Sequence, residues 1–300
     1  RAAPMSQAGA MQVHLVDGTY ELFRQFYGRN SGHTNAEGTE VGAVRGALRS
    51  TFALLNDGAT HVGVATDHVI ESFRNDLYEG YKTGDGIDPE LFGQFGLFED
   101  ALRAAGFTVW PMVEQEADDA LAAAAKVASA DDRVERVVIL TPDKDLGQCC
   151  AWPKVVQYDR RNQVFRDADG VREKFGVDPE SIPDWLGLVG DTADGFPGLP
   201  GWGAKSAAAV LAHYKHLEHI PDAPGKWEIS VRSAARLAAT LAQQRSDAYL
   251  FRTIATLQTD ADVGTVDDWR WSGPTPKLGH YAQLLDAPDL LRSAQALTNR

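Results

Sequence analysis

The sequence predicts an α/β fold, in which a mainly parallel sheet carries helices on both faces and a helical region follows. Up to about residue 170, short apolar runs rich in β-branched residues alternate with helical stretches, which is typical of buried parallel strands. Beyond that point helical stretches separated by glycine and proline continue without strand-like runs. The length of 300 residues fits about two domains.

Short apolar runs mark the expected strands. The runs at 12–16 and 62–66 lead directly into Asp17 and Asp67, and the run at 137–141 leads to Asp143 and Asp145. A separate run at 155–166 is expected to form a hairpin that turns near Arg161 and Asn162. The predicted strands of the sheet cover 12–16, 62–66, 108–112 and 137–141.

Helical stretches connect these strands and then continue alone. The stretch that opens at Pro89 has Asp88 as its cap and proline at its first position, both of which favour a helix start. The predicted helices cover 20–27, 41–55, 89–105, 116–128, 171–175, 182–188, 204–214, 233–244 and 247–256. The predicted domains are a leader or tag remnant at 1–10, an α/β core at 11–170 with an irregular segment at about 71–90, and a helical region at 171–300.

Composition limits the classes of protein that the chain can represent. No run approaches 18 apolar residues, which excludes a transmembrane helix, and residues 1–10 lack the apolar stretch of a signal peptide. The adjacent Cys149 and Cys150 cannot form a disulfide framework, so we expect a reducing, cytoplasmic setting and small buried thiols. The formal net charge of −13, from 42 acidic against 29 basic residues, by itself argues against a nucleic-acid partner.

The acidic residues, however, follow a pattern. Asp17, Asp67 and the pair Asp143 and Asp145 stand at or just beyond the carboxyl ends of predicted strands, the edge at which open parallel sheets bind ligands. The helix that begins Glu116-Ala117-Asp118-Asp119 adds three more carboxylates. Acids at one helix start are explained by compensation of the helix dipole as well as by ligand binding. Dipole compensation does not explain acids at three strand ends.

Converging carboxylates repel one another and raise each other's pKa unless a cation lies among them. Because the candidate ligands are carboxylates without cysteine or histidine partners, they indicate a hard divalent ion such as Mg²⁺ or Mn²⁺. Two such ions are the usual clamp for in-line displacement at a phosphodiester. A receiver or phosphatase-like fold, with one metal and an aspartyl nucleophile, is the α/β alternative.

Taken together, these motifs resemble the bacterial 5′-nuclease family, which includes flap endonucleases and the 5′→3′ exonuclease domain of DNA polymerase I. The resemblance runs from about Met11 to at least Ala255, and its most specific part is the glycine-rich stretch at 190–205. It is carried by Leu15-Val16-Asp17-Gly18, by Asp67 with Phe73-Arg74 and Tyr78 to Lys82, by Glu116 to Asp119, by Thr141 to Leu146, and by Gly190-Asp191 to Gly203. The family implies a PIN-like core and a helix-hairpin-helix type of DNA-binding motif in the helical region.

The resemblance also implies which acids hold metal. A first ion would be held by Asp17, Asp67 and Asp118, and a second by Asp143, Asp145 and Asp191. Glu116, Asp119 and Asp194 would bond through water or take a further ion. The segment at 71–90 would form an arch in which Lys82 and Arg74 stabilise charge on the scissile phosphate, although composition alone favours a solvated loop.

DNA contacts are expected in two places. On the first helix, Tyr20 or Phe23 could stack on a terminal base, with Arg24 beside them, although most aromatic residues there are expected in the core. In the glycine hairpin, Gly198, Gly201 and Gly203 are expected at positive φ, and the helix start with Lys205 would grip a duplex phosphate. Leu199 and Trp202 would anchor the hairpin in the core, and a monovalent cation would lie at the hairpin. The alternative is a purely structural turn.

Two positions depart from the family pattern. Asp85 stands where an arginine usually follows the tyrosine–lysine pair, so one cation of the arch is missing or supplied elsewhere. Gly195 replaces the usual asparagine, which we expect to change loop rigidity more than chemistry.

The expected function is therefore a metal-dependent 5′-nuclease for DNA with 5′ ends, 5′ flaps or RNA-primed ends in replication and repair. The protein is expected to be monomeric, cytoplasmic and associated with the nucleoid, without a membrane partner. Nine of the 42 acids belong to the metal cluster, so bound cations would offset part of the negative field and allow a salt-dependent affinity for DNA. The alternatives are a PIN-type RNase and a DNA-binding module without catalysis.

Overall fold

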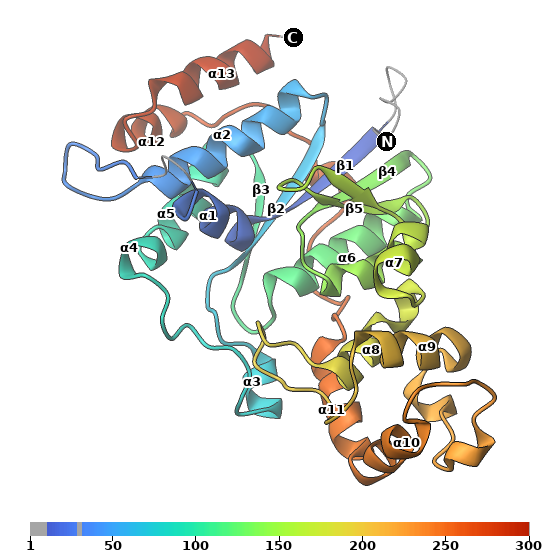
Figure 1. The fold of residues 1–300 in the computed structure, drawn as a ribbon. Helices are drawn as coiled ribbons and strands as arrows, with labels where there is room; N and C mark the ends of the chain where they lie inside the picture. Colours follow the sequence, from blue (N-terminus) through green and yellow to red (C-terminus); the bar gives the residue numbers. More distant parts are fainter. Residues whose placement is uncertain (1–10, 29–31, 300) are drawn as a thin grey trace. The chain divides into compact units, whose positions relative to one another are not determined.

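The computed structural model describes residues 11–28 and 32–299, and its chain divides into two compact units (Figure 1). The first unit comprises the described residues up to Ile70, Gly84–Thr141 and the segment from Gln258 onward. The second comprises Glu71–Thr83 and Pro142–Leu257. The predicted leader at 1–10 lies outside the described residues. The predicted boundary near 170 falls inside the second unit and the predicted arch at 71–90 is divided between the units, so that domain scheme stays a prediction.

The first unit is built on parallel strands in the order β3-β2-β1-β4. Their β-branched side chains are largely buried, as expected for strands covered on both faces. The predicted strands are confirmed, and the observed bounds are β1 Met11–Asp17, β2 His61–Asp67, β3 Thr108–Met112 and β4 Val134–Leu140.

Helices cover both faces of this sheet, which confirms the predicted fold class. Helices α1 (Gly18–Phe26), α2 (Gly42–Asn56) and α5 (Phe95–Ala104) lie in the connections that lead from β1 to β2 and on to β3, whereas α6 (Ala117–Ala130) leads back across to β4. Since parallel crossovers are right-handed, the two directions place the helices on opposite faces. The direction reverses between β1 and β4, where ligands bind in sheets of this kind.

The predicted helix at 89–105 is wrong as one element, because it forms α4 (Pro89–Phe92) and α5 with a break at Gly93. The start is as predicted, since Asp88 accepts a hydrogen bond from the Glu90 amide. The break lies beside a tertiary contact. Buried Gln94 accepts a bond from the amide of Val44, in the first turn of α2, which has no side-chain cap of its own.

The second unit is mainly helical and includes one antiparallel hairpin, which confirms the predicted turn near Arg161 and Asn162. Its core contains Leu199 and Trp202 and the thiol of Cys150, as expected, and burial raises the pKa of that thiol to about 11. The helices and strands are α3 Phe73–Leu77, β5 Val155–Asp159, β6 Val164–Arg166, α7 Ala168–Phe175, α8 Ile182–Val189, α9 Ala204–Tyr214, α10 Ala234–Gln243 and α11 Arg245–Ala255, with the 3₁₀ turns η1 Asp145–Ala151, η2 Pro179–Ser181, η3 Leu217–His219 and η4 Pro224–Lys226.

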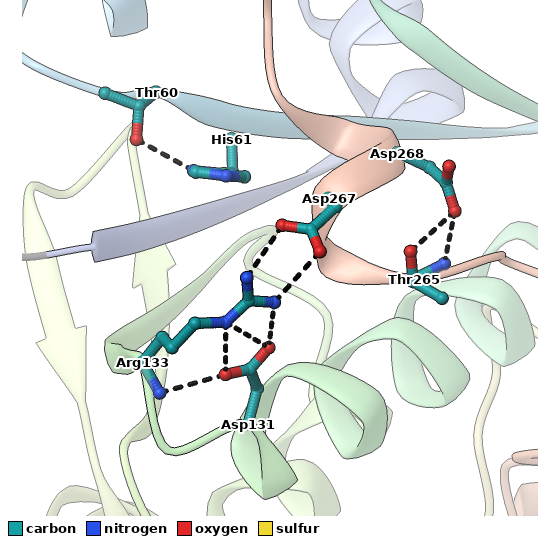
Figure 2. Close-up of polar contacts among 7 residues, drawn as sticks. All are labelled: Thr60, His61, Asp131, Arg133, Thr265, Asp267 and Asp268. Carbon is teal, nitrogen blue, oxygen red and sulfur yellow. Dashed lines mark hydrogen bonds and ion pairs between the residues drawn. The ribbon is translucent and has the colours of Figure 1, made fainter.

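The C-terminal segment completes the first unit with η5 (Val266–Trp269), α12 (Leu278–Leu284) and α13 (Pro288–Thr298). Trp269 is buried and packs edge-on against Trp110, with ring centroids 5.4 Å apart. Figure 2 shows Arg133, just before β4, bridging Asp131 and Asp267 at 2.7 and 2.9 Å. Arg133 is exposed, so these ion pairs add little stability, whereas Trp269 attaches the segment by burying a large aromatic side chain. None of the described helices has both the length and the hydrophobicity needed to cross a membrane.

Candidate functional site

Three carboxylates of the second unit converge. Asp145 begins η1, and Asp191 and Asp194 lie in the turn after α8. One oxygen from each lies within 4.8 Å of the others, and among the described residues no other set of three or more acid, histidine or cysteine side chains converges this closely. The turn is held by a backbone bridge in which the Asp191 amide donates to the Phe196 carbonyl at 2.8 Å.

Gly195 gives this turn its shape. Its φ is +87°, and a Cβ there would lie 2.2 Å from the carbonyl oxygen of Gly80. The close approach lets the Lys82 amide donate to the Asp194 carbonyl at 2.9 Å. A side chain would prevent this approach. Glycine, in place of the family's asparagine, therefore lets the turn contact the segment that carries Lys82.

The trio holds more negative charge than its surroundings neutralise. Burial, and then the neighbouring carboxylates, hold the pKa of Asp145 well above its usual range, and its buried Oδ1 has no hydrogen-bond partner among the described residues. Burial raises the pKa of Asp194 to about 6 against the opposing effect of Lys82. Lys144 forms an ion pair with Asp191, and Lys82 with Asp194 at 3.1 Å. An unsatisfied carboxylate oxygen among converging acids fits a hard divalent cation.

Asp143, predicted as a ligand of the same ion, stands beside this trio. One of its carboxylate oxygens accepts a bond from the Asp145 amide at 2.9 Å, and its carbonyl accepts one from Gln157. Its role as a metal ligand stays a prediction. Lys144, between the two aspartates, was missed at the sequence level, although a lysine inside an acidic strand end is itself a signal of charge compensation.

Two predicted ligands of the first unit, Asp17 and Asp67, stand at the ends of the paired strands β1 and β2. Asp17, at the end of β1, accepts bonds from the Tyr20 amide and the Thr141 hydroxyl, both at 2.8 Å. Asp67, at the end of β2, accepts one from the Ala117 amide at 2.7 Å. These bonds fix the carboxylates at the sheet edge, as expected for acids at strand ends.

The three acids at the start of α6 have different environments. Asp119 is fully buried and accepts bonds from the amides of Glu116 and Gln258, so its contacts are those of a helix cap. Asp118 is half-buried and Glu116 buried. The metal-binding roles of Asp17, Asp67, Glu116, Asp118 and Asp119 stay predictions.

The two predicted cations of the arch lie in contrasting places. Lys82 is partly exposed beside Asp194. Arg74 is only 2% exposed and donates to the carbonyls of Ile254 and Thr256 at 2.7 and 3.3 Å, where α11 ends. Carbonyls at a helix C-terminus lack intrahelical donors, so Arg74 satisfies them. Its catalytic role stays a prediction.

The proposed stacking residues lie on α1. The ring of Phe23 is 6.3 Å from that of Phe95, and Tyr20 is half-buried. Arg24 pairs with the buried Glu21 at 2.7 Å and donates to Ser50. These contacts orient α1, and the DNA contacts of Tyr20, Phe23 and Arg24 stay predictions.

The glycine hairpin follows α8. Gly198 has a φ of +68°, and a Cβ there would lie 2.3 Å from the Gly190 nitrogen, so only glycine fits this crossing. Gly201 is also at positive φ, as predicted. The prediction for Gly203 is wrong, because its φ of −146° is extended. The reason is its place as the N-cap of α9, where extended backbone is usual. Lys205 is exposed in the first turn of that helix.

Comparisons with known proteins cover nearly the whole chain. Residues 12–176 match the family described as "5′-3′ exonuclease, N-terminal resolvase-like domain", and residues 177–277 match "5′-3′ exonuclease, C-terminal SAM fold". DNA polymerase I of Pseudomonas aeruginosa is 33% identical over 303 residues, which cover 97% of this chain but 32% of that protein. The chain therefore spans about a third of that relative.

Solved structures share the fold. The zinc-bound 5′-exonuclease of bacteriophage T5 aligns over 96% of this chain and 98% of its own, with a TM-score of 0.65 and 16% identity. The catalytic core of Rad2 in complex with a DNA substrate aligns over 99% and 95%, also with a TM-score of 0.65 and 16% identity.

Proposed function

The chain belongs to the 5′-3′ exonuclease family, a family of metal-dependent nucleases, and we propose that it is a structure-specific 5′-nuclease. Its substrates would be DNA with 5′ ends or 5′ flaps, including RNA-primed ends, in replication and repair. The observation that carries the proposal is the trio Asp145, Asp191 and Asp194, with its unsatisfied Oδ1 and adjacent Lys82. The zinc in the T5 enzyme and the DNA in the Rad2 complex support it.

In this proposal, Asp143, Asp145 and Asp191 hold one divalent ion, and Asp17, Asp67 and Asp118 hold another. When bound, Mg²⁺ or Mn²⁺ would supply an activated water and stabilise charge on the phosphate oxygens. The chain's own contribution is a rigid carboxylate set, because Asp17 and Asp67 are fixed by hydrogen bonds and Asp191 by its backbone bridge. Lys82 would bring a cation to the scissile phosphate.

The finer expectations belong to the same proposal. A monovalent cation at the glycine hairpin would support its grip on a phosphate. The protein would act as a monomer in the cytoplasm, associated with the nucleoid through its DNA substrates.

One cleavage experiment tests the proposal. The chain is incubated with 5′-flap, nicked and single-stranded DNA and with a matched RNA, with Mg²⁺, Mn²⁺ or EDTA. We expect cleavage of flapped and 5′-ended DNA that EDTA abolishes. Preference for RNA would favour a PIN-type RNase, and DNA binding without cleavage would indicate a module that has lost catalysis. Cleavage that persists in EDTA would contradict the metal scheme.

Gly203→Asp tests the hairpin as the duplex site. The position tolerates a side chain, because φ is extended and nothing lies within 4 Å of where a Cβ would be. The added carboxylate would repel a phosphate at the start of α9, so we expect weaker duplex binding, a shallower salt dependence and little change on single strands. Gly225→Asp adds the same charge at another open glycine of this unit and is the control. Equal affinities of the Gly203 variant and the unmodified protein across a salt series would make the hairpin purely structural.

A further inference from the structure

A cavity of about 820 Å³ lies in the second unit between the hairpin, α9 and α10. Three cations line it: Lys205 from α9, Arg232 from just before α10, and Arg236 from the first turn of α10. Three serine hydroxyls join them, and the lining includes no carboxylate and no aromatic ring. The residues lining the cavity are Gly201, Gly203, Ala204, Lys205, Ser206, Ala209, Ser230, Val231, Arg232, Ser233, Arg236 and Leu237.

The packing of the hairpin fixes α10 beside it. Trp202 is buried, and its indole nitrogen donates to the Leu237 carbonyl at 3.2 Å. One residue earlier, the Arg236 guanidinium lies 3.3 Å from where a Cβ of Gly201 would be. The hairpin and α10 therefore present one continuous wall, and Arg236 lies against the turn.

The three cations of the cavity differ from several arginines of the same unit in their lack of ion pairs. Arg172, Arg245 and Arg252 each form ion pairs with carboxylates. Lys205, Arg232 and Arg236 line the cavity, and none of them forms an ion pair or side-chain hydrogen bond with any residue that the structure describes. In a chain of net charge −13, three unneutralised cations around one cavity create a local positive field that attracts an anion.

We infer that Arg232 and Arg236 bind backbone phosphates of duplex DNA, together with Lys205. The inference rests on the proposed function and extends the duplex site from the hairpin to α10, to which the sequence pattern assigns no role. A phosphodiester backbone fits because the lining offers cations and hydroxyls, which hold phosphate oxygens. Single-stranded bases fit less well, since the lining contains no aromatic ring of the kind on which single-strand binders stack bases.

The test compares Arg232→Gln, Arg236→Gln and the double variant with Lys226→Gln, an exposed cation of the same unit outside the cavity. Affinities for a nicked duplex and for single-stranded DNA are measured by fluorescence anisotropy in EDTA across a salt series. We expect each arginine variant to bind the duplex about tenfold more weakly. The slope of log K against log salt should fall by about 0.9 for each lost contact. Single-strand binding and the Lys226 variant should be unchanged.

The outcomes separate this inference from the function on which it rests. Wild-type protein that neither binds nor cleaves duplex substrates would overturn the proposed function. A wild-type protein that does both, with arginine variants that bind the duplex equally well, would overturn only the assignment of α10. Equal weakening on duplex and single strand would also overturn it. Thermal unfolding of each variant confirms that the comparison is between folded proteins, and Arg232, which forms no ion pair or side-chain hydrogen bond with the described residues, is the safeguard if Arg236→Gln is unstable.

Discussion

Asp145→Asn is expected to lower the cleavage rate by on the order of 10³-fold or more. Asparagine has nearly the same shape as aspartate, so η1 should keep its geometry. It lacks the negative charge that a hard divalent ion requires of its ligands. Asp145 has the strongest claim among the predicted ligands, because its Oδ1 is buried and unsatisfied among the described residues. We expect the loss to appear in the single-turnover rate with saturating Mg²⁺ or Mn²⁺.

In EDTA the same substitution should stabilise the protein, by about 1–3 kcal/mol at pH 7. Burial raises the folded-state pKa of Asp145 above its unfolded value, so ionisation of this carboxyl costs folding free energy as pH rises. The stabilising effect should therefore be present at neutral pH. It should vanish at low pH, where Asp145 is protonated in both states. Thermal unfolding between pH 4 and pH 7.5 measures this difference.

Asp247→Asn, at an exposed acid of the same unit, is the control and should change neither rate nor stability by much. An Asp145 variant with unimpaired cleavage would remove this residue from the metal site. A destabilised variant would mean that the charge of Asp145 is compensated in solution and that burial does not make its ionisation costly.

The strands and α9 could be predicted from sequence because their signals are local. Runs of β-branched residues marked the positions of β1 to β4, and Gly203 before an alanine-rich stretch marked the start of α9. The break between α4 and α5 could not be predicted. At the break Gln94 accepts a bond from Val44, fifty residues earlier in the chain, and no short window contains both residues.

The candidate site shows the same division. The acids at strand ends were visible in the sequence, but their environments were not. Asp119 and Asp145 are both aspartates in acidic segments of the sequence. In the structure, however, Asp119 accepts hydrogen bonds from two backbone amides, and Asp145 has an oxygen without a partner among the described residues. The family resemblance assigns Arg74 to the arch, and the sequence could not show its carbonyl partners, because these lie about 180 residues away. Burial and long-range hydrogen bonds are properties of the fold, which composition and spacing do not report.

Lys82→Ala is expected to reduce the single-turnover rate on the order of 10²-fold while changing DNA affinity much less. Lys82 is held in place by its backbone, since its amide donates to Asp194 and its carbonyl accepts a bond from Asn75 at 3.0 Å. Its ammonium group is 3.1 Å from Asp194 and its side chain is 30% exposed, so it can exchange this carboxylate for a phosphate oxygen when substrate arrives. A cation that acts on charge developing at the scissile phosphate affects the rate more than binding.

The alternative is that Lys82 only neutralises Asp194, and the experiment distinguishes the two roles. Without the ammonium group, the pKa of Asp194 should rise further above about 6, because Lys82 is what opposes the effect of burial. If Lys82 only neutralises Asp194, its loss would lower activity mainly at low pH, and alkaline pH or more metal would restore that activity. A lysine that acts on the phosphate would leave a rate deficit that neither change restores. Lys82→Ala is compared with Lys226→Ala at pH 6.5 and 8.5 and at two metal concentrations, measuring rate and affinity separately. Full rescue at pH 8.5, or equal small losses in rate and affinity, would assign Lys82 to charge balance alone.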